Sequence, residues 1–290
     1  MTNLPVTTPE VFAARIAELQ QQAASKGEGV FLIADQSGFP RMREAQPLLK
    51  PMAWCNLLNT SRDSHLDGAS PLLIQLPADA ASTRLIKWLY KQGRYANSLS
   101  VLTSPMELGV LHTQLRQRTE LELPDNMLML FRYFDTRALP LLPRLLTAEH
   151  YAAFFACVSA WHYLDRAGSV LQLPAAKTST PPKFTPPIKL DVQQQRLLID
   201  DGLTDAVIDQ LLEQRAPGLR GLNPPQQYEC VAPLVEAASA WGIGDVIPTL
   251  HFVNTALEVG RDFHEHEPWA SRLLAFKAGK ITLEEALQHE

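Results

Sequence analysis

The chain has 290 residues, of which 46% are hydrophobic and 20% charged, with a formal net charge of −5. These values are typical of a globular protein with one large or two smaller domains, and they exclude global disorder. No apolar stretch approaches the about 18 residues that a membrane helix needs, so we expect no membrane span. The first residues also lack the basic start and apolar core of a signal peptide, which predicts a cytoplasmic protein.

Charge and cysteine usage narrow the possible partners. Residues 1–190 hold fifteen acidic and nineteen basic residues, whereas residues 191–290 hold sixteen acidic and seven basic ones. No basic cluster occurs, so we expect no nucleic-acid partner. The acidic half is either a surface for a basic protein partner or an ordinary solvated surface. The three cysteines are widely spaced and form no Cys-x-x-Cys pair, which predicts reduced thiols and no zinc ribbon.

The first part of the chain alternates between strand and helix patterns. Thr8 followed by Pro9 is a typical helix start. Further along, apolar runs predict strands at 30–34, 71–76, 99–102, 127–131, 161–163 and 170–173, and helical spacing predicts helices at 80–91, 105–118, 139–146 and 148–159. This order predicts an α/β lobe in which helices flank a mixed sheet.

The run 127–131 reads as a central strand of the parallel type, buried on both faces, which would place Met127 and Met129 in the core. Three charged residues, Arg132, Asp135 and Arg137, follow it. They would either bind an anion or clamp the loop to the next helix. We favour the clamp because Asp135 offers both arginines a local partner. Removing one member of a buried pair costs about 3–5 kcal/mol, so Asp135→Ala is expected to lower the melting temperature.

A proline-rich segment suggests a boundary. Five prolines lie between positions 174 and 187, and the segment has no helical or strand period. We therefore predict an α/β lobe at 1–173, a linker at 174–189 and an all-helical lobe at 190–290, although a proline-rich loop within one domain would look the same. Helical spacing in the last lobe occurs at 193–198, 206–212, 226–240, 246–259 and 283–288, and Gly242 is expected to end one of these helices.

Several segments, in this order, resemble one known family. They are Val-Phe-Leu-Ile-Ala-Asp at 30–35, Ser-Pro-Leu-Leu-Ile at 70–74, Trp88, Phe-Arg-Tyr-Phe-Asp-Thr-Arg at 131–137, and Trp161. Together they resemble the type VI secretion effector chaperones, also called adaptors, over roughly residues 28–172. The family segment resembles Phe-Arg-aromatic-aromatic-Asp-Pro-Arg, and Thr136 stands here in place of the proline. We expect this change to loosen the turn. Gly260, Phe263 and Pro268 resemble an arrangement in the appended lobe of longer members.

This resemblance implies a chaperone or adaptor that binds a cognate toxin, the effector, and helps to load it onto the spike-tip protein of the type VI secretion system. The motif residues would be Phe131, Arg132, Tyr133, Asp135 and Arg137. We expect cargo to bind in an apolar groove between the lobes. Trp269 is the candidate contact residue at its rim, and Arg132 and Arg137 are further candidates if they are exposed.

The main alternative to a binding protein is an enzyme. The sequence contains no Gly-x-Ser-x-Gly, Gly-x-Gly-x-x-Gly or phosphate-binding glycine loop. His264 and His266 are two residues apart, which does not place them on one helical face, and His65 between Asp63 and Asp67 is typical of a turn. We expect no enzyme, metal or cofactor. The alternative is an enzyme or binder of an anionic small molecule, with Arg132 and Arg137 as the clamp and Asp135 as acid or base.

Most of the tryptophan and cysteine side chains in apolar segments are expected to lie in the core. Trp88 and Trp161 lie within periodic apolar segments and are predicted to be core residues, as are Cys157 and Cys55 beside Trp54. Trp269, in a polar context, is the tryptophan that we expect to be exposed.

Overall fold

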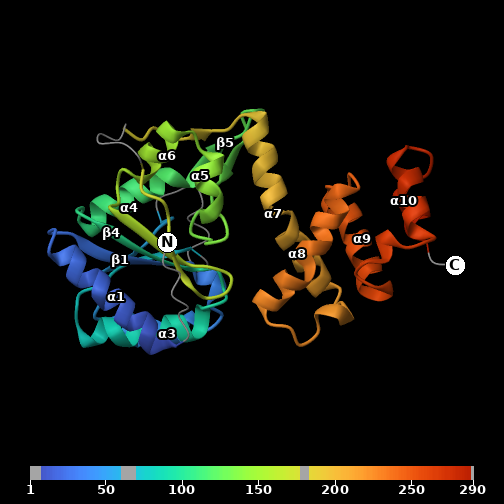
Figure 1. Ribbon diagram of the computed structural model, residues 1–290. Helices are drawn as coiled ribbons and strands as arrows, with labels where there is room; N and C mark the ends of the chain where they lie inside the picture. The colour runs from blue at the N-terminus through green and yellow to red at the C-terminus, as the bar shows by residue number, and fades with distance from the viewer. Residues whose placement is uncertain (1–7, 60–69, 177–182, 289–290) are drawn as a thin grey trace. The chain divides into compact units, whose positions relative to one another are not determined.

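The computed structural model describes residues 8–59, 70–176 and 183–288 (Figure 1). The chain divides into two compact units, Met1–Gln195 and Arg196–Glu290, here called unit 1 and unit 2. Unit 1 contains strands and helices, whereas the described part of unit 2 is helical. The predicted fold class, an α/β part followed by an all-helical part, is therefore confirmed.

Unit 1 is organised around a six-stranded sheet with the order β2-β3-β1-β4-β7-β8. Every neighbouring pair in this sheet is antiparallel. The strands are β1 (Gly29–Ala34), β2 (Trp54–Asn56), β3 (Leu72–Gln75), β4 (Leu99–Ser104), β7 (Ala160–Leu164) and β8 (Val170–Gln172). The apolar runs predicted all of these except β2, which has only three residues.

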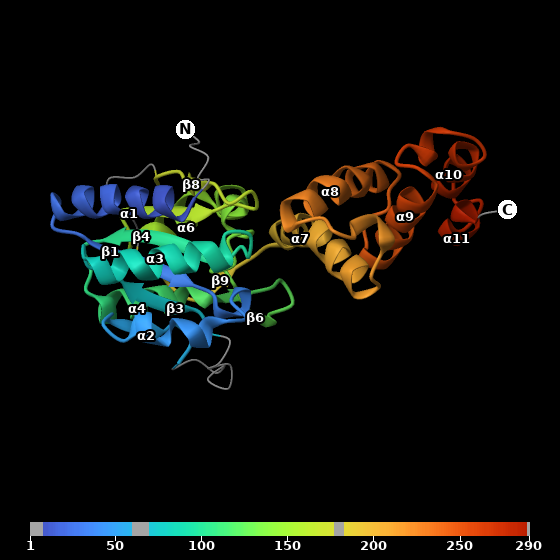
Figure 2. The ribbon, with the colours of Figure 1, turned by 90° about the horizontal axis from the view of Figure 1, so that it is seen from below.

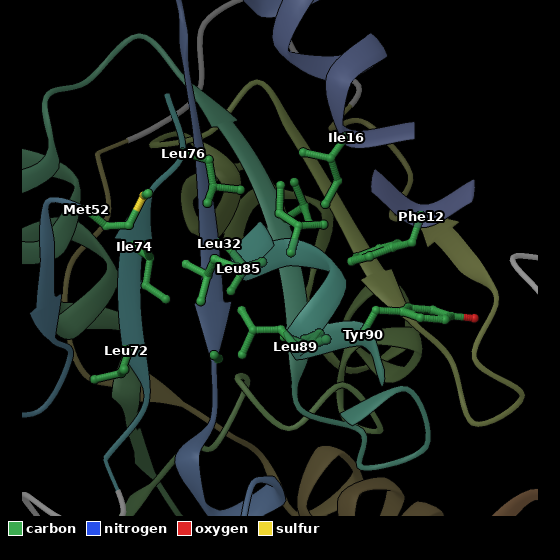
Figure 3. Packing of buried hydrophobic residues seen from close by; sticks show 14 of the residues in the cluster. Phe12, Ile16, Leu32, Met52, Leu72, Ile74, Leu76, Leu85, Leu89 and Tyr90 are labelled. Atoms are coloured by element: carbon green, nitrogen blue, oxygen red, sulfur yellow. The ribbon is translucent and has the colours of Figure 1, made fainter. Parts of the chain in front are cut away.

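One face of the sheet packs against α1 (Pro9–Ala24) and α3 (Ala80–Gly93). Figure 3 shows Leu85 and Leu89 of α3 beside Leu32 of β1, and Phe12 of α1 beside Tyr90 of α3. Thr8 caps α1 by accepting a hydrogen bond from the backbone N–H of Val11 at 3.2 Å, as the sequence predicted. The alternation of side chains along each strand sends even-numbered residues of β1 into this layer.

The other face carries an aromatic core. Register places Phe31, Leu102 and Trp161 side by side across β1, β4 and β7, so that they share this face. Trp161 is buried and packs against Phe154 of α6 (Ala148–Phe155). The remaining helices of unit 1 are α2 (Gln46–Leu49), α4 (Leu108–Arg116) and α5 (Leu142–Leu145).

A second, three-stranded sheet has the order β6-β5-β9 and contains β5 (Glu120–Glu122), β6 (Leu128–Leu130) and β9 (Ile188–Lys189). β5 pairs antiparallel with β6 and parallel with β9. Residues 188–189, at the end of the predicted linker, thus form a strand of unit 1, and the division between the units falls within α7 (Val192–Glu213). Positions 177–182 of the predicted linker lie outside the described residues.

The prediction of a buried central strand at 127–131 is wrong. Among the residues that the structure describes, β6 pairs with β5 and with no other strand, and Met127, Leu128 and Met129 are 55%, 46% and 36% exposed. The expected burial of Met127 and Met129 is therefore also wrong. A short apolar run predicts neither how many neighbouring strands a strand has nor whether it lies at the surface. Phe131, directly after the end of β6, is buried.

Unit 2 contains most of α7, together with α8 (Pro224–Ala240), α9 (Val246–Val259), α10 (Trp269–Lys277) and α11 (Leu283–Leu287). The two helical segments predicted at 193–198 and 206–212 are one continuous helix, and α10 was not predicted. Asn223 and Thr282 form capping boxes at the starts of α8 and α11. Gly242 follows α8 with a φ of 85°, a conformation that glycine adopts at little cost, as expected for a helix end.

Candidate functional site

The aromatic residues of the segment 131–137 are part of the core of unit 1. Phe131, Tyr133 and Phe134 are all buried. The Tyr133 ring lies edge-on to the rings of Phe154 and Trp161, each 5.6 Å away between centroids. Its hydroxyl donates to the backbone carbonyl of Leu115 at 2.9 Å, and burial raises the pKa of this phenol well above its ordinary value. These residues thus anchor the segment and are not available to a ligand.

Arg132 pairs with a residue that lies far away in the sequence. Its Nη2 is 2.9 Å from Oδ2 of Asp35, the residue that follows β1, and 3.1 Å from the hydroxyl of Ser37. Asp35 is only 2% exposed and also accepts the backbone N–H of Ser37, which caps a 3-10 turn at Gln36–Gly38. The Arg132 side chain is 51% exposed. The ion pair therefore ties the segment to the end of the central strand and keeps part of the guanidinium at the surface.

Asp135 and Arg137 form a separate, local pair. Arg137 Nη2 lies 2.6 Å from Asp135 Oδ2, and Arg137 Nε lies 3.0 Å from Oδ1 of the same carboxylate. Both side chains are partly buried. Of the three charged residues predicted to interact, Asp135 thus pairs with Arg137, and Arg132 pairs with Asp35 instead. Asp35 could not be predicted as the partner of Arg132, because 97 positions separate the two residues in the sequence.

This arrangement changes the expected effect of removing a carboxylate. We expect Asp35→Ala to lower the free energy of unfolding by about 2–3 kcal/mol, because it removes a helical-turn cap and leaves Arg132 without its buried partner. Asp135→Ala breaks a partly exposed pair and is expected to cost about 1 kcal/mol or less. Urea unfolding of the two variants provides the comparison. An equal or larger loss for Asp135→Ala would contradict the assignment.

Thr136 does not loosen the turn, contrary to the expectation from the sequence. Its backbone N–H donates to the carbonyl of Asn97 at 2.8 Å, and its hydroxyl donates to the carbonyl of Leu164 at 2.7 Å. The residue is buried. A proline at this position would have neither donor, so Thr136 connects the segment to β7 through bonds that a proline cannot form.

The candidate contact residue Trp269 is half-buried, not exposed. It stands at the start of α10, packs against the core of unit 2, and lies edge-on to Phe263 with 5.9 Å between ring centroids. The tryptophan with the large exposed surface is Trp54 on the edge strand β2, at 46%. Trp161 is buried as predicted, and Trp88 is half-buried against the first core. Cys157 is buried as predicted, whereas Cys55 is only partly buried.

No group of three or more metal-ligating residues occurs in the described parts of the chain, 8–59, 70–176 and 183–288. His266 pairs with Asp262, its neighbour one helical turn earlier, at 3.1 Å. His264 is partly buried and lies next to the Phe252 ring. The group around His65 lies outside the described residues.

Two buried polar residues of unit 1 were not singled out from the sequence. Arg118, 1% exposed, donates to the carbonyls of Phe154 at 2.6 Å and Ala153 at 2.9 Å, and to the carbonyl of Gln114. These carbonyls lie in the last turns of α6 and α4, where the negative ends of the helix dipoles favour a cation. Arg118 therefore caps the C-terminal ends of both α4 and α6. Nothing in the local pattern distinguishes it from the other charged residues near it.

His162 is the second. It lies on β7, is 5% exposed, and its Nδ1 has no hydrogen-bond partner within the described part of the chain. Burial, and secondarily the positive charge of Arg15, lower its pKa to about 4 from 6.5. The folded protein therefore holds this imidazole neutral through the pH range in which an unfolded chain takes up a proton.

We predict a matching dependence of stability on pH. The pKa of His162 is lower in the folded than in the unfolded protein, so the unfolded chain takes up a proton first as the pH falls. The free energy of unfolding is therefore highest above pH 6.5 and falls by an amount on the order of 3 kcal/mol as the pH approaches 4. Urea unfolding at several pH values checks this, with His162→Gln as the reference. The stability of the wild type relative to the variant is expected to fall across this window. A constant difference between the two would contradict it.

In the comparison with known proteins, a family model matches part of unit 1. Residues 30–153 match the model described as "Domain of unknown function (DUF4123)". This DUF4123 segment runs from β1 into α6 and includes Asp35 and all of 131–137, but neither Trp161 nor unit 2. No curated protein and no solved structure matches the chain. No helix in the described residues has both the length and the apolar character needed to cross a membrane.

Proposed function

We propose that this chain is a cytoplasmic adaptor, without enzymatic activity, that binds a cognate type VI secretion toxin and helps to load it onto the spike-tip protein. The observation that carries the proposal is the match of residues 30–153 to the DUF4123 model. The match contains 30–35 and 131–137, two of the segments on which the resemblance to the effector adaptors rests. The match supports a role associated with type VI secretion. That the bound partner is a toxin is part of the proposal.

The geometry of 131–137 supports a structural part for this segment in such an adaptor. Its aromatic side chains fill the core, and Arg132 and Arg137 hold the loop through Asp35 and Asp135. The motif thus positions the surface around it, and a partner is recognised mainly by other residues. Arg132 remains a candidate contact because about half of its side chain is exposed. Trp269, Arg137 and the groove between the lobes remain predictions.

The alternative function, an enzyme or binder acting on an anionic small molecule, requires a guanidinium clamp that is open to a ligand. Arg132 and Arg137 each pair with a carboxylate at 2.9 Å and 2.6 Å. An anion would have to displace these carboxylates and would be repelled by the negative charges of Asp35 and Asp135, which disfavours binding. Tight binding of phosphate or acidic metabolites by the purified chain would revive this alternative.

Co-purification tests the proposed function. The full chain, tagged and co-expressed with the toxin and the spike-tip protein encoded beside it, is expected to retain the toxin through size-exclusion chromatography. Each unit alone, residues 1–195 and residues 196–290, is tested in parallel. Full binding by one unit would remove the predicted groove between the lobes and leave the adaptor function intact. No binding of the neighbouring toxin by the full chain would contradict the proposed function itself.

A further inference from the structure

Among the described residues, no strand pairs with the outer edge of β6. In the order β6-β5-β9, β6 has a neighbour on one side only, and Figure 2 shows it at the margin of unit 1. Leu123 N–H donates to the Met127 carbonyl at 2.9 Å, and Phe131 N–H donates to the Thr119 carbonyl at 2.7 Å. Hydrogen-bonded and non-hydrogen-bonded residue pairs alternate along an antiparallel pair of strands. The backbone N–H and C=O groups of Met129, which pairs with Leu121, therefore also point towards β5.

It follows that Leu128 and Leu130 direct their backbone N–H and C=O groups away from β5. Within the described residues, no hydrogen bond is recorded for these groups outside the β5–β6 ladder. Four backbone groups thus form a row with the spacing of a strand. An unpaired row of this kind accepts one class of occupant, an extended backbone that continues the sheet.

The side chains of this edge are unusual for a protein surface. Met127, Leu128 and Met129 are exposed in succession, and alternation distributes them over both faces of the strand. Natural proteins commonly protect edge strands with charged residues or proline, and β6 contains neither. Flexible methionine side chains adapt to varied apolar partners. The edge is thus suited to an extended segment with apolar residues on both faces.

The charges near this edge indicate which kind of extended segment would bind there. Glu120 pairs with Leu130 in the register, so its exposed carboxylate lies on the same face as Leu128 and Leu130. The next acidic residue on this face, Glu122, is already neutralised by Lys189 at 2.8 Å. Asp125 in the β5–β6 turn is also exposed. The rim of the edge is therefore acidic and complements a segment that carries a basic residue.

We infer that the free edge of β6 binds an extended segment of the cognate toxin, which adds a fourth strand to the small sheet. The segment would have apolar residues at successive positions and a lysine or arginine facing Glu120. The inference rests on the proposed function for the identity of the partner, whereas the mode of binding comes from the backbone groups of Leu128 and Leu130.

Amide hydrogen exchange provides the direct test. In the complex of the full chain with its toxin, the N–H groups of Leu128 and Leu130 are expected to become protected. The N–H of Met129, already directed towards β5, is expected to change little. Unchanged exchange at Leu128 and Leu130 in a complex that forms would overturn the inference while leaving the proposed function in place.

Variants provide an independent readout. Leu128→Pro removes an outward donor without breaking a bond to β5, and Leu128→Lys adds an edge charge. Both are expected to weaken toxin binding by about tenfold or more, with an unchanged melting temperature. The control is Val110→Lys, at an exposed position of α4, which should bind like the wild type. Wild-type affinity of both Leu128 variants would overturn the inference. A dimer of this chain that Leu128→Lys dissociates would assign the edge to a second copy instead. Failure of the wild type to bind any toxin would remove the proposed function as well.

Discussion

Arg118→Met is expected to lower the free energy of unfolding by about 3–5 kcal/mol, the largest loss for a charged residue in unit 1. The methionine fills a similar volume but leaves the carbonyls of Phe154, Ala153 and Gln114 without their buried donor, and each stranded group costs about 1–3 kcal/mol. The C-terminal ends of α4 and α6 lose this capping side chain together. The guanidinium also leaves the face of the Phe184 ring, 4.2 Å away.

Urea unfolding followed by far-ultraviolet circular dichroism measures this loss. Arg43→Met, at an exposed position, is the matched control and should change stability by no more than about 0.5 kcal/mol. Arg118→Lys should recover only part of the loss, because an ammonium group does not reproduce the planar set of donors. Equal stability of Arg118→Met and Arg43→Met would show that Arg118 does not cap the two helices.

Tyr133→Ala is expected to cost about 3–5 kcal/mol, because it opens a cavity in the centre of the aromatic core. The ring contacts Phe131, Phe134, Phe154 and Trp161, all edge-on, so its removal takes a packing partner from four side chains at once.

Tyr133→Phe separates the two contributions of this residue. It keeps the ring and removes only the hydroxyl that donates to Leu115, so we expect a loss of about 1 kcal/mol. Urea midpoints measure both variants. A loss for Tyr133→Phe that equals the loss for Tyr133→Ala would contradict the packing account and place the stabilisation in the hydrogen bond.

The elements that the sequence predicted well are those whose burial repeats along the chain. β1 and β4 are buried on both faces because each lies between two strands and two layers, and the apolar residues at 30–34 and 99–102 reflect this burial. α1 begins at its predicted cap because Thr8 and Pro9 act locally. The helical character of residues 196–288 was also predictable, since period and capping are local properties.

What the sequence could not predict depends on contacts between distant residues. The run 127–130 looks like β1, yet it lies on an edge, because strand order is not encoded in hydrophobicity alone. Asp35 and Arg132 meet only after β1 and the segment 131–137 come together. Trp269 stands among polar residues but packs against Phe263, whereas Trp54 follows an apolar pattern and lies exposed on β2. The predicted pairing of Asp135 with Arg137 occurs, whereas Arg132 pairs with Asp35 and not with Asp135.

Deleting the gene for this chain in the bacterium that encodes it tests the central claim most directly. The measurement is secretion of the neighbouring toxin, with a type VI substrate encoded elsewhere as the control. The account predicts that the toxin stays in the cell, that the control substrate is still secreted, and that a plasmid-borne wild-type gene restores toxin secretion. Unchanged secretion of the toxin in the deletion strain would contradict the account.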